Sequence, residues 1–366
     1  MTRRLRSFVG LGVFALVLSA CAATTPNASP GGSPGTSPGG GAGPVVEGGR
    51  LAAVQERGQL ICGVNGALPG FSFLDQATSE NTGFDSDFCR AVAAAVLGDA
   101  DAVDFRAVGA DARGPALQTG EVDVLIRNTT WTSSRDTTWG LFAPTTFYDG
   151  QGMLTAADGP ATLEELAGAT ICVQSGTTTE LNLTDQMRAR GIEFTPLVFA
   201  DIDPTYQAYE EGRCDAVTSD RSQLIARRTT FENPDDHTIM DVVMSKEPLG
   251  PAVPLGDDQW FNVVKWVVIA TIEAEESGIT SANVEEMRDT SENPVVRRLL
   301  GVEPEVGTLA SSLGLDNDWV VNMILAVGNY GEIYDRNLGP DTIFALERGP
   351  NNLWTEGGLL YAPPYR

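Results

Sequence analysis

The same order of short segments occurs twice in the chain, and this repeat restricts the possible folds more than any other feature. Thr170–Val173 resembles Leu60–Gly63, with an Ile-Cys pair in each. Gly212–Val217 resembles Gly120–Leu125, since each has a Gly-x-x-Asp turn before an apolar run. Short apolar runs that alternate with helical patterns indicate βαβ units and open parallel sheets. We therefore predict an α/β chain with two similar lobes, against the alternative of chance similarity among βαβ units.

Local patterns predict the individual elements. Leu60–Val64 is typical of a strand, and the apolar residues after Asp85 recur at i, i+3, i+4, i+7 and i+8. This spacing predicts a helix that Asp85 caps and that ends at Gly98. The other predicted elements are strands at 103–108, 122–126, 170–173 and 216–217, helices at 177–190, 260–274 and 318–327, a short helix ending at Gly120, an extended crossover at 147–153 and a C-terminal strap at 361–365.

The N-terminus has the pattern of an export signal. Three arginines precede the apolar stretch Phe8–Leu18, which is too short for an ordinary membrane span. Leu18–Cys21 resembles the lipobox of bacterial lipoproteins, so residues 1–21 are predicted to be a signal peptide ending in a lipidated Cys21; ordinary cleavage beside a coincidental cysteine is the alternative. Residues 22–48 are rich in Gly, Pro and Ser and are predicted to be a disordered tether. We expect an extracytoplasmic protein anchored to the cell membrane by this lipid.

Charge and composition narrow the possible partners. The net charge is −25, which argues against nucleic acid as a partner. Small zwitterions remain possible ligands, because local charges in a cleft decide their affinity. The single histidine, His237, lies in a polar run that predicts a surface turn, and no usual zinc spacing is present. We therefore predict no catalytic residue, no metal and no cofactor.

The cysteines admit several arrangements. If Cys21 carries lipid, four cysteines remain, and they can pair in three ways. Export makes disulfides plausible, and pairing within each lobe would not resist a hinge motion as pairing across lobes would. Within-lobe pairing joins Cys62 to Cys89 and Cys172 to Cys214. Four buried free thiols are the alternative.

Two charged residues sit where an open α/β sheet binds ligands, at the carboxyl ends of its strands. Arg135 ends the polar run after the third strand, and its planar guanidinium can grip a carboxylate with two hydrogen bonds. Asp220 follows a predicted strand in the second repeat and can receive an ammonium group, although capping the helix at 221–228 is its common role. Together they suit a free amino acid, which carries both charges.

Two loops accompany these charges. Gln174–Glu180 opens a helix, so its free N-H groups can bind an anion; a plain N-cap with a capping-box glutamate is the alternative. Leu68 and Phe71 lie in the loop after the first strand and can cover the apolar part of a ligand, with core packing as the alternative.

From about Arg50 to the C-terminus, the chain resembles the polar amino-acid family of ABC substrate-binding proteins, solute-binding protein family 3, and within it the general L-amino-acid-binding periplasmic proteins. The matching stretches are 82–85, 119–125, 127–132, 172–183 and 245–253. The resemblance implies a periplasmic-binding-protein-like fold of type II, with two α/β lobes joined by a two-strand hinge. It also implies a first lobe at 49–152 and 245–366, the latter with a C-terminal extension, and a second lobe at 153–244.

The resemblance further implies a non-enzymatic monomer that captures a free L-amino acid and delivers it to the permease of an ABC importer. The implied ligand contacts are Arg135 and N-H groups near Thr177 and Thr178 for the α-carboxylate, Asp220 for the α-ammonium, hydrogen bonds from Asn128 and Thr130, and an apolar lid from the loop of Phe71 and Leu68. The four cysteines match the family as well.

One departure concerns Gly114 and Pro115, which stand where the family usually has a bulky residue beside an arginine such as Arg113. We expect a wider side-chain pocket from this difference. Two other functions remain open: a dehydratase-like enzyme on the same fold that acts on a small carboxylate, and a sensory lobe that signals without transport.

Overall fold

The computed structural model describes residues 49–302 and 306–365. The predicted signal peptide, the lipidation site Cys21 and the tether at 22–48 lie outside the described residues.

The first sheet has the strand order β5-β1-β6-β15-β7. β1 runs parallel to both of its neighbours, β5 and β6, and β15 is antiparallel to both β6 and β7. The expected parallel sheet is therefore mixed at one side, where no helical crossover dictates the strand direction. The strands are β1 (Leu60–Val64), β5 (Val103–Ala107), β6 (Val124–Leu125), β7 (Leu141–Phe142) and β15 (Ala252–Val253).

The second sheet repeats this plan in the order β11-β10-β12-β9-β13. Here β10 is parallel to both of its neighbours, β11 and β12, and β9 is antiparallel to β12 and β13. The two α/β lobes predicted from the repeat are confirmed. The strands are β9 (Gln151–Ala156), β10 (Thr170–Gln174), β11 (Thr195–Phe199), β12 (Ala216–Asp220) and β13 (His237–Ile239).

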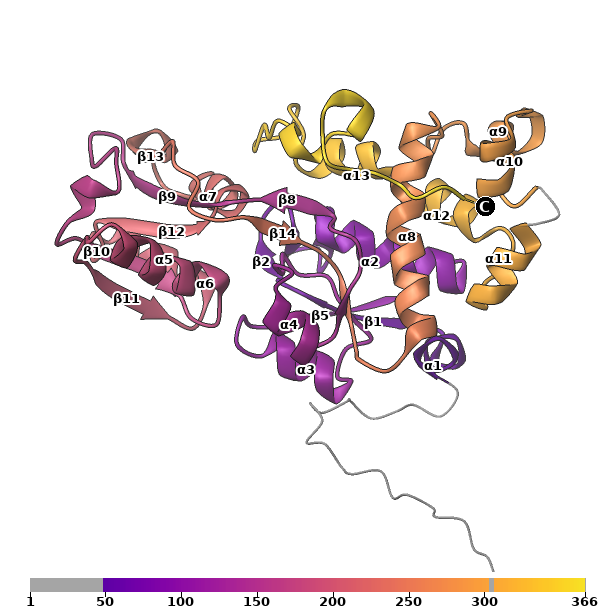
Figure 1. Cartoon of the computed structure of the whole chain (residues 1–366), viewed down its shortest axis with the longest axis horizontal. Helices are drawn as coiled ribbons and strands as arrows, with labels where there is room; N and C mark the ends of the chain where they lie inside the picture. Colours follow the sequence, from indigo (N-terminus) through magenta and orange to yellow (C-terminus); the bar gives the residue numbers. More distant parts are fainter. Residues whose placement is uncertain (1–48, 303–305, 366) are drawn as a thin grey trace, which may run out of the picture. The chain divides into compact units, whose positions relative to one another are not determined.

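Two antiparallel strands connect the lobes, β8 (Phe147–Asp149) and β14 (Glu247–Leu249) (Figure 1). Both belong to stretches that the sequence predicted to be extended or to resume the first lobe. β9 starts at Gln151, inside the range 49–152 assigned to the first lobe. The boundaries at 152 and 244 stay a prediction.

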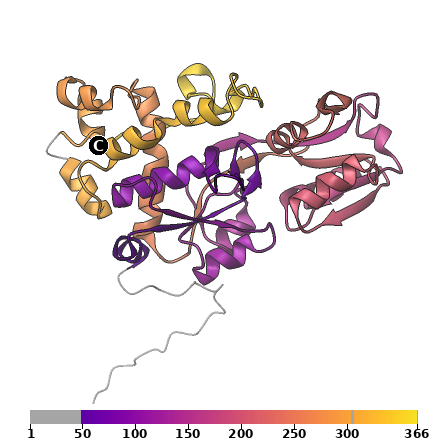
Figure 2. The same cartoon turned by 180° about the vertical axis from the view of Figure 1, so that it is seen from behind.

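Helices cover both sheets (Figure 2). In the first lobe, α2 packs on β1 and is itself covered by α8 and α12, so it is buried on nearly all sides. The first-lobe helices are α1 (Gly49–Arg57), α2 (Phe84–Leu97), α3 (Arg113–Thr119), α4 (Ser133–Thr138), α8 (Asp258–Glu276), α9 (Val284–Thr290), α10 (Pro294–Leu299), α11 (Val306–Leu313), α12 (Trp319–Val327) and α13 (Tyr330–Asn337). The second lobe has α5 (Thr178–Ala189), α6 (Ile202–Glu210) and α7 (Arg221–Arg228). No described helix is long and apolar enough to cross a membrane.

The start of α2 corrects the prediction that Asp85 caps it. The helix begins at Phe84, and its N-cap is Gly83, with φ 125° and no room for a Cβ, which would lie 2.3 Å from the Phe71 carbonyl oxygen. Asp85 lies in the first turn, and its carboxylate accepts a hydrogen bond from the Asn128 backbone N-H at 2.7 Å. This contact with a distant loop outweighs the local capping role. The predicted end at Gly98 is confirmed, with Gly98 in the left-handed conformation.

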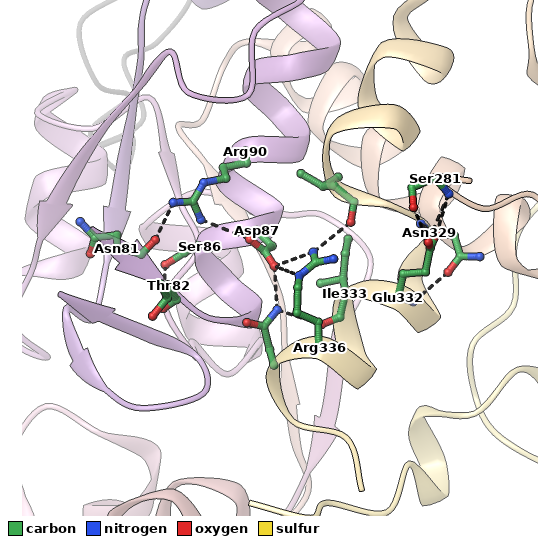
Figure 3. A network of polar contacts seen from close by, with 12 residues as sticks. Asn81, Thr82, Ser86, Asp87, Arg90, Ser281, Asn329, Glu332, Ile333 and Arg336 are labelled. Carbon is green, nitrogen blue, oxygen red and sulfur yellow. Dashed lines mark hydrogen bonds and ion pairs between the residues drawn. The ribbon is translucent and has the colours of Figure 1, made fainter. Parts of the chain in front are cut away.

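The C-terminal extension is held to the first lobe by ion pairs and hydrogen bonds (Figure 3). Arg336 and Asn337 of α13 both donate to the Asp87 carboxylate at 2.7 Å, and Arg90 binds its other oxygen at 3.2 Å. Glu332 accepts from the backbone N-H and the hydroxyl of Ser281. These contacts join α13 to α2 and to the segment after α8.

Both disulfides form within a lobe, which is one of the three pairings that the sequence left open. Cys62–Cys89 links β1 to α2, and Cys172–Cys214 links β10 to the turn before β12. Neither bond crosses between the lobes, so neither opposes movement about β8 and β14.

Candidate functional site

A small polar pocket lies at the carboxyl ends of β6, β10 and β12, between the two lobes. Its volume is about 20 Å³, room for roughly one water molecule. Every lining residue is polar or charged, which suits a polar ligand. The lining residues are Arg113, Arg127, Asn128, Thr130, Gln174, Thr177, Thr178, Thr179, Ser219, Asp220 and Gln223.

Hydrogen bonds join the lobes around this pocket. Arg113 and Arg135 each donate to the Gly176 carbonyl, at 3.3 and 3.4 Å. The Asn128 amide donates to Gln223 of α7 at 3.1 Å. The lobes therefore meet at the pocket, and a ligand larger than water must separate them to enter.

Asp220 ends β12 and points into the pocket without a partner. It stands at the N-cap position of α7, yet its side chain makes no capping hydrogen bond, and its Oδ1 atom is buried with no hydrogen-bond partner. Burial raises the pKa of this carboxyl well above its ordinary value, and the negative charges of Asp149 and Glu247 raise it further. The capping alternative therefore does not describe Asp220, and the site has a buried carboxyl oxygen without a hydrogen-bond partner.

Arg113 is the corresponding cation from the first lobe. It starts α3, is buried, and its Nε atom has no partner; its remaining bonds to Thr129 and Gly176 are long, at 3.3 Å. Burial lowers the pKa of the Arg113 guanidinium well below its ordinary value, and the nearby charge of Arg127 lowers it further. An incoming carboxylate would relieve both effects.

Arg135 is buried in α4 but does not line the pocket. Its guanidinium donates to the carbonyls of Thr130 and Gly176, at 3.0 and 3.4 Å, and lies over the Trp139 ring at 4.7 Å. Burial lowers the pKa of this guanidinium as well. In this structure Arg135 therefore has backbone carbonyls as its hydrogen-bond partners.

Trp139 fills the space beside Gly114. A Cβ at Gly114 would lie 2.6 Å from the Trp139 ring. The wider side-chain pocket expected from Gly114 and Pro115 stays a prediction.

The loop before α5 forms the N-cap that was the alternative for it, and its anion-binding role stays a prediction. Thr177 caps the helix by accepting from the Glu180 N-H at 3.1 Å, and Glu180 in turn accepts from the Gly176 N-H. The N-H groups of Thr178 and Thr179 belong to the first turn and have no acceptor inside the helix. Capping therefore leaves two donors beside the pocket.

Asn128 and Thr130 also line the pocket. Asn128 has a φ of 28°, a strained value for a residue with a side chain, and accepts from the Asn65 amide at 3.0 Å. Its backbone N-H is bound by Asp85, whose pKa burial raises to about 7. The unusual backbone of Asn128 is thus held by buried partners on lobe 1.

Leu68 and Phe71 lie in the core and not at the pocket. Both are fully buried, and Phe71 packs edge-on against Phe84 and Phe147. Core packing, the alternative for this loop, describes their position.

His237 is not the surface turn residue that the sequence predicted. It starts β13, is half-buried, and its Nδ1 lies 2.8 Å from the Tyr209 hydroxyl.

Sequence reasoning did not select Arg113, Arg127, Gln223 or Glu247 as site residues. Arg127 and Gln223 had a usable signal, because Arg127 opens the polar run after β6 and Gln223 is one helical turn after Asp220. For Arg113 and Glu247 the only signal was the family resemblance, since distant segments bring them to the site.

Comparison with known proteins agrees with this architecture. Residues 60–277 match the model of bacterial extracellular solute-binding proteins, family 3. The chain is 50% identical to the general L-amino acid-binding periplasmic protein AapJ of Rhizobium johnstonii, over 86% of this chain and 92% of the relative. It is 49% identical to the glutamate/glutamine/aspartate/asparagine-binding protein BztA of Rhodobacter capsulatus, over 86% and 93%.

Among solved structures, an ABC transporter periplasmic binding protein from Brucella ovis with glutathione bound is 50% identical, with a TM-score of 0.84, and covers 86% of this chain and 99% of that one. The C-terminal extension, which follows the family match, is thus shared with full-length relatives. The chain belongs to the bacterial extracellular solute-binding proteins of family 3.

Proposed function

We propose that this protein captures L-amino acids in the pocket between its lobes and delivers them to the permease of an ABC importer. One observation carries the proposal. Of the four buried side-chain atoms without a partner in the described chain, Arg113 Nε and Asp220 Oδ1 have opposite charges and belong to residues lining the same pocket. Unpartnered buried charges are costly, and a zwitterion supplies a partner to each. Relatives named as amino-acid-binding proteins support the same function.

In this proposal, the α-ammonium binds Asp220 and the α-carboxylate binds Arg113, the N-H groups near Thr177 and Thr178, and Arg135 once it leaves Gly176. Asn128 and Thr130 supply further hydrogen bonds. The all-polar lining favours ligands with polar side chains, a class that includes those in the name of BztA.

Ligand entry requires movement, because the cavity of about 20 Å³ is too small for an amino acid. We propose that the lobes rotate about β8 and β14, open, and close again on the ligand. Contacts from both lobes are needed, since a ligand shifts the equilibrium only by its different affinity for the two states.

The N-terminus completes the proposal. Lipidation of Cys21 and a flexible tether at 22–48 would keep a monomeric binding body beside its permease. We propose that the protein is not an enzyme. A dehydratase-like activity would produce a new compound from a bound ligand, which mass spectrometry of the ligand after incubation detects.

The first prediction tests binding itself. Protein lacking residues 1–21 should be stabilised by polar L-amino acids, by roughly 4 kcal/mol at about 1,000 times the dissociation constant. Thermal-shift assays and calorimetry over the natural amino acids measure this effect. The same panel of D-amino acids is the control. If no amino acid shifts the melting temperature, the proposed function is wrong.

The second prediction concerns the carboxylate receptor. Arg113→Met and Arg135→Met should each weaken amino-acid binding by roughly 2–5 kcal/mol, because each removes one partner of a buried charge pair. Arg106→Met is the matched control, since Arg106 lies on the same lobe in an exposed pair with Asp104. Calorimetry on the three variants measures these affinities. If Arg113→Met or Arg135→Met binds as tightly as the wild type, the arginine replaced in that variant does not contact the carboxylate.

A further inference from the structure

Glu247 is a buried carboxylate at the point where both lobes and a connecting strand meet. It lies in β14 and is 1% exposed. Within the described chain no Lys or Arg side chain forms an ion pair with it, and it accepts hydrogen bonds from four side chains instead. These are Thr130 of the first lobe, Thr178 and Asn182 of the second lobe, and Ser245.

The two oxygens of Glu247 have separate partners. Oε2 accepts from the Thr130 hydroxyl at 2.6 Å and from the Thr178 hydroxyl at 2.8 Å. Oε1 accepts from the Asn182 amide at 2.8 Å and from the Ser245 hydroxyl. One oxygen therefore faces only the two threonines that line the pocket.

This arrangement determines what the threonines can offer a ligand. A hydroxyl has one proton to donate and two lone pairs that accept, and an ionised carboxylate can only accept. Thr130 and Thr178 therefore each use their single hydroxyl proton in the hydrogen bond to Glu247. Their hydroxyl oxygens, 3.2 Å apart, present only lone pairs to the pocket.

We propose that Glu247 is a positioning residue that sets the polarity of the site: it turns the hydroxyls of Thr130 and Thr178 into acceptors for the ligand ammonium. This inference rests on the proposed amino-acid binding. The ammonium then has Asp220 and two hydroxyl oxygens as acceptors, while the carboxylate is left to the guanidinium and N-H donors. A ligand inserted in the reverse orientation would meet lone pairs with its carboxylate.

The test compares two substitutions of the same residue. Glu247→Met has no acceptor, so both hydroxyls can turn and donate into the pocket; affinity for a polar L-amino acid should fall roughly 10- to 100-fold. Glu247→Gln keeps one oxygen for the threonines, because Asn182 and Ser245 can reorient toward its NH₂ group. Its affinity should stay near that of the wild type. If the Gln variant binds as weakly as the Met variant, Glu247 acts through its charge and the inference is wrong.

A double-mutant cycle separates positioning from a structural role. Thr130→Val removes one acceptor and should weaken binding about as much as Glu247→Met, and the double variant should lose little more than either one. Ser245→Ala is the matched control, since it removes a donor to Oε1 and leaves the threonine-facing oxygen intact; its affinity should be unchanged. Calorimetry gives the affinities, and melting temperatures without ligand show that the variants are folded.

Besides weak binding by Glu247→Gln, two outcomes overturn the inference while the proposed function stands: additive losses in the cycle, or wild-type affinity in Glu247→Met. A wild-type protein that binds no amino acid overturns the proposed function first, and this inference with it. The wild-type measurement alone therefore distinguishes the two failures.

Discussion

Asp220→Asn should weaken amino-acid binding by roughly 2–5 kcal/mol and leave the ligand-free protein as stable as before or more so. The loss arises because the ammonium faces a neutral amide in place of a carboxylate. The ligand-free protein loses nothing, because Oδ1 of Asp220 has no hydrogen bond to break and its charge is desolvated and repelled by Asp149 and Glu247. Calorimetry measures binding, and urea unfolding measures stability.

Asp220 should also make ligand binding and stability depend on pH, and the direction follows from its raised pKa. As pH falls through this pKa, the carboxyl takes up a proton and cannot receive the ammonium, so wild-type affinity should decrease and ligand binding should release a proton. The folded ligand-free protein holds this proton more tightly than the unfolded chain, so Asp220 lowers stability as pH rises through its folded pKa.

Asp220→Asn should remove the contribution of the Asp220 carboxyl to the pH dependence of affinity and to that of stability. Asp104→Asn, at an exposed ion pair of the first lobe, is the control and should keep the wild-type profile. An Asp220→Asn variant with wild-type affinity would exclude Asp220 as the ammonium receptor.

The second large effect concerns the disulfides. Replacing Cys62 and Cys89 together by alanine should lower the free energy of unfolding by about 3.5 kcal/mol, because the bond closes a loop with a sequence separation of 27 in the unfolded chain. For Cys172 and Cys214, with a separation of 42, the expected loss is about 4 kcal/mol. Urea unfolding with and without a reducing agent measures these losses.

Affinity for ligand should change little in either disulfide variant at temperatures where it remains folded, since neither bond crosses between the lobes. Each variant also serves as a control for the other. A reducing agent should destabilise each variant only by breaking the one disulfide that the variant keeps. A large loss of affinity in either variant would show that the disulfide shapes the pocket.

Local signals predicted the elements of the fold well. The strand β1 has the predicted bounds Leu60–Val64, and the glycines that end α2 and α3 adopt the left-handed conformation that helix ends favour. These features depend on neighbours in sequence, so a single sequence contains them. Where a distant segment intervened, prediction failed: Asp85 binds the Asn128 backbone instead of capping α2, and Leu68 and Phe71 pack into the core.

For the candidate site, the sequence predicted several of the residues that lie together, but their roles in ligand binding have not been tested. Asp220 and the loop of Thr177 and Thr178 were selected because they follow strand ends, and Asn128 and Thr130 were selected from the family resemblance. The structure brings these five residues to one pocket. Their roles in ligand binding stay a prediction, as does the role of Arg135, which the structure places behind Gly176.

The chain's order of strands and helices, its doubled α/β plan and the polar residues at its strand ends are properties of the sequence by itself, because periodicity and turn residues specify them locally. Only the tertiary structure decided that Arg113 and Asp220 line one pocket, that Trp139 fills the space beside Gly114, and that Glu247 accepts hydrogen bonds from two threonines of opposite lobes. Each of these three arrangements brings together residues that are far apart in the sequence. Such residues become neighbours only when the chain is folded, so the sequence alone does not show which of them will meet.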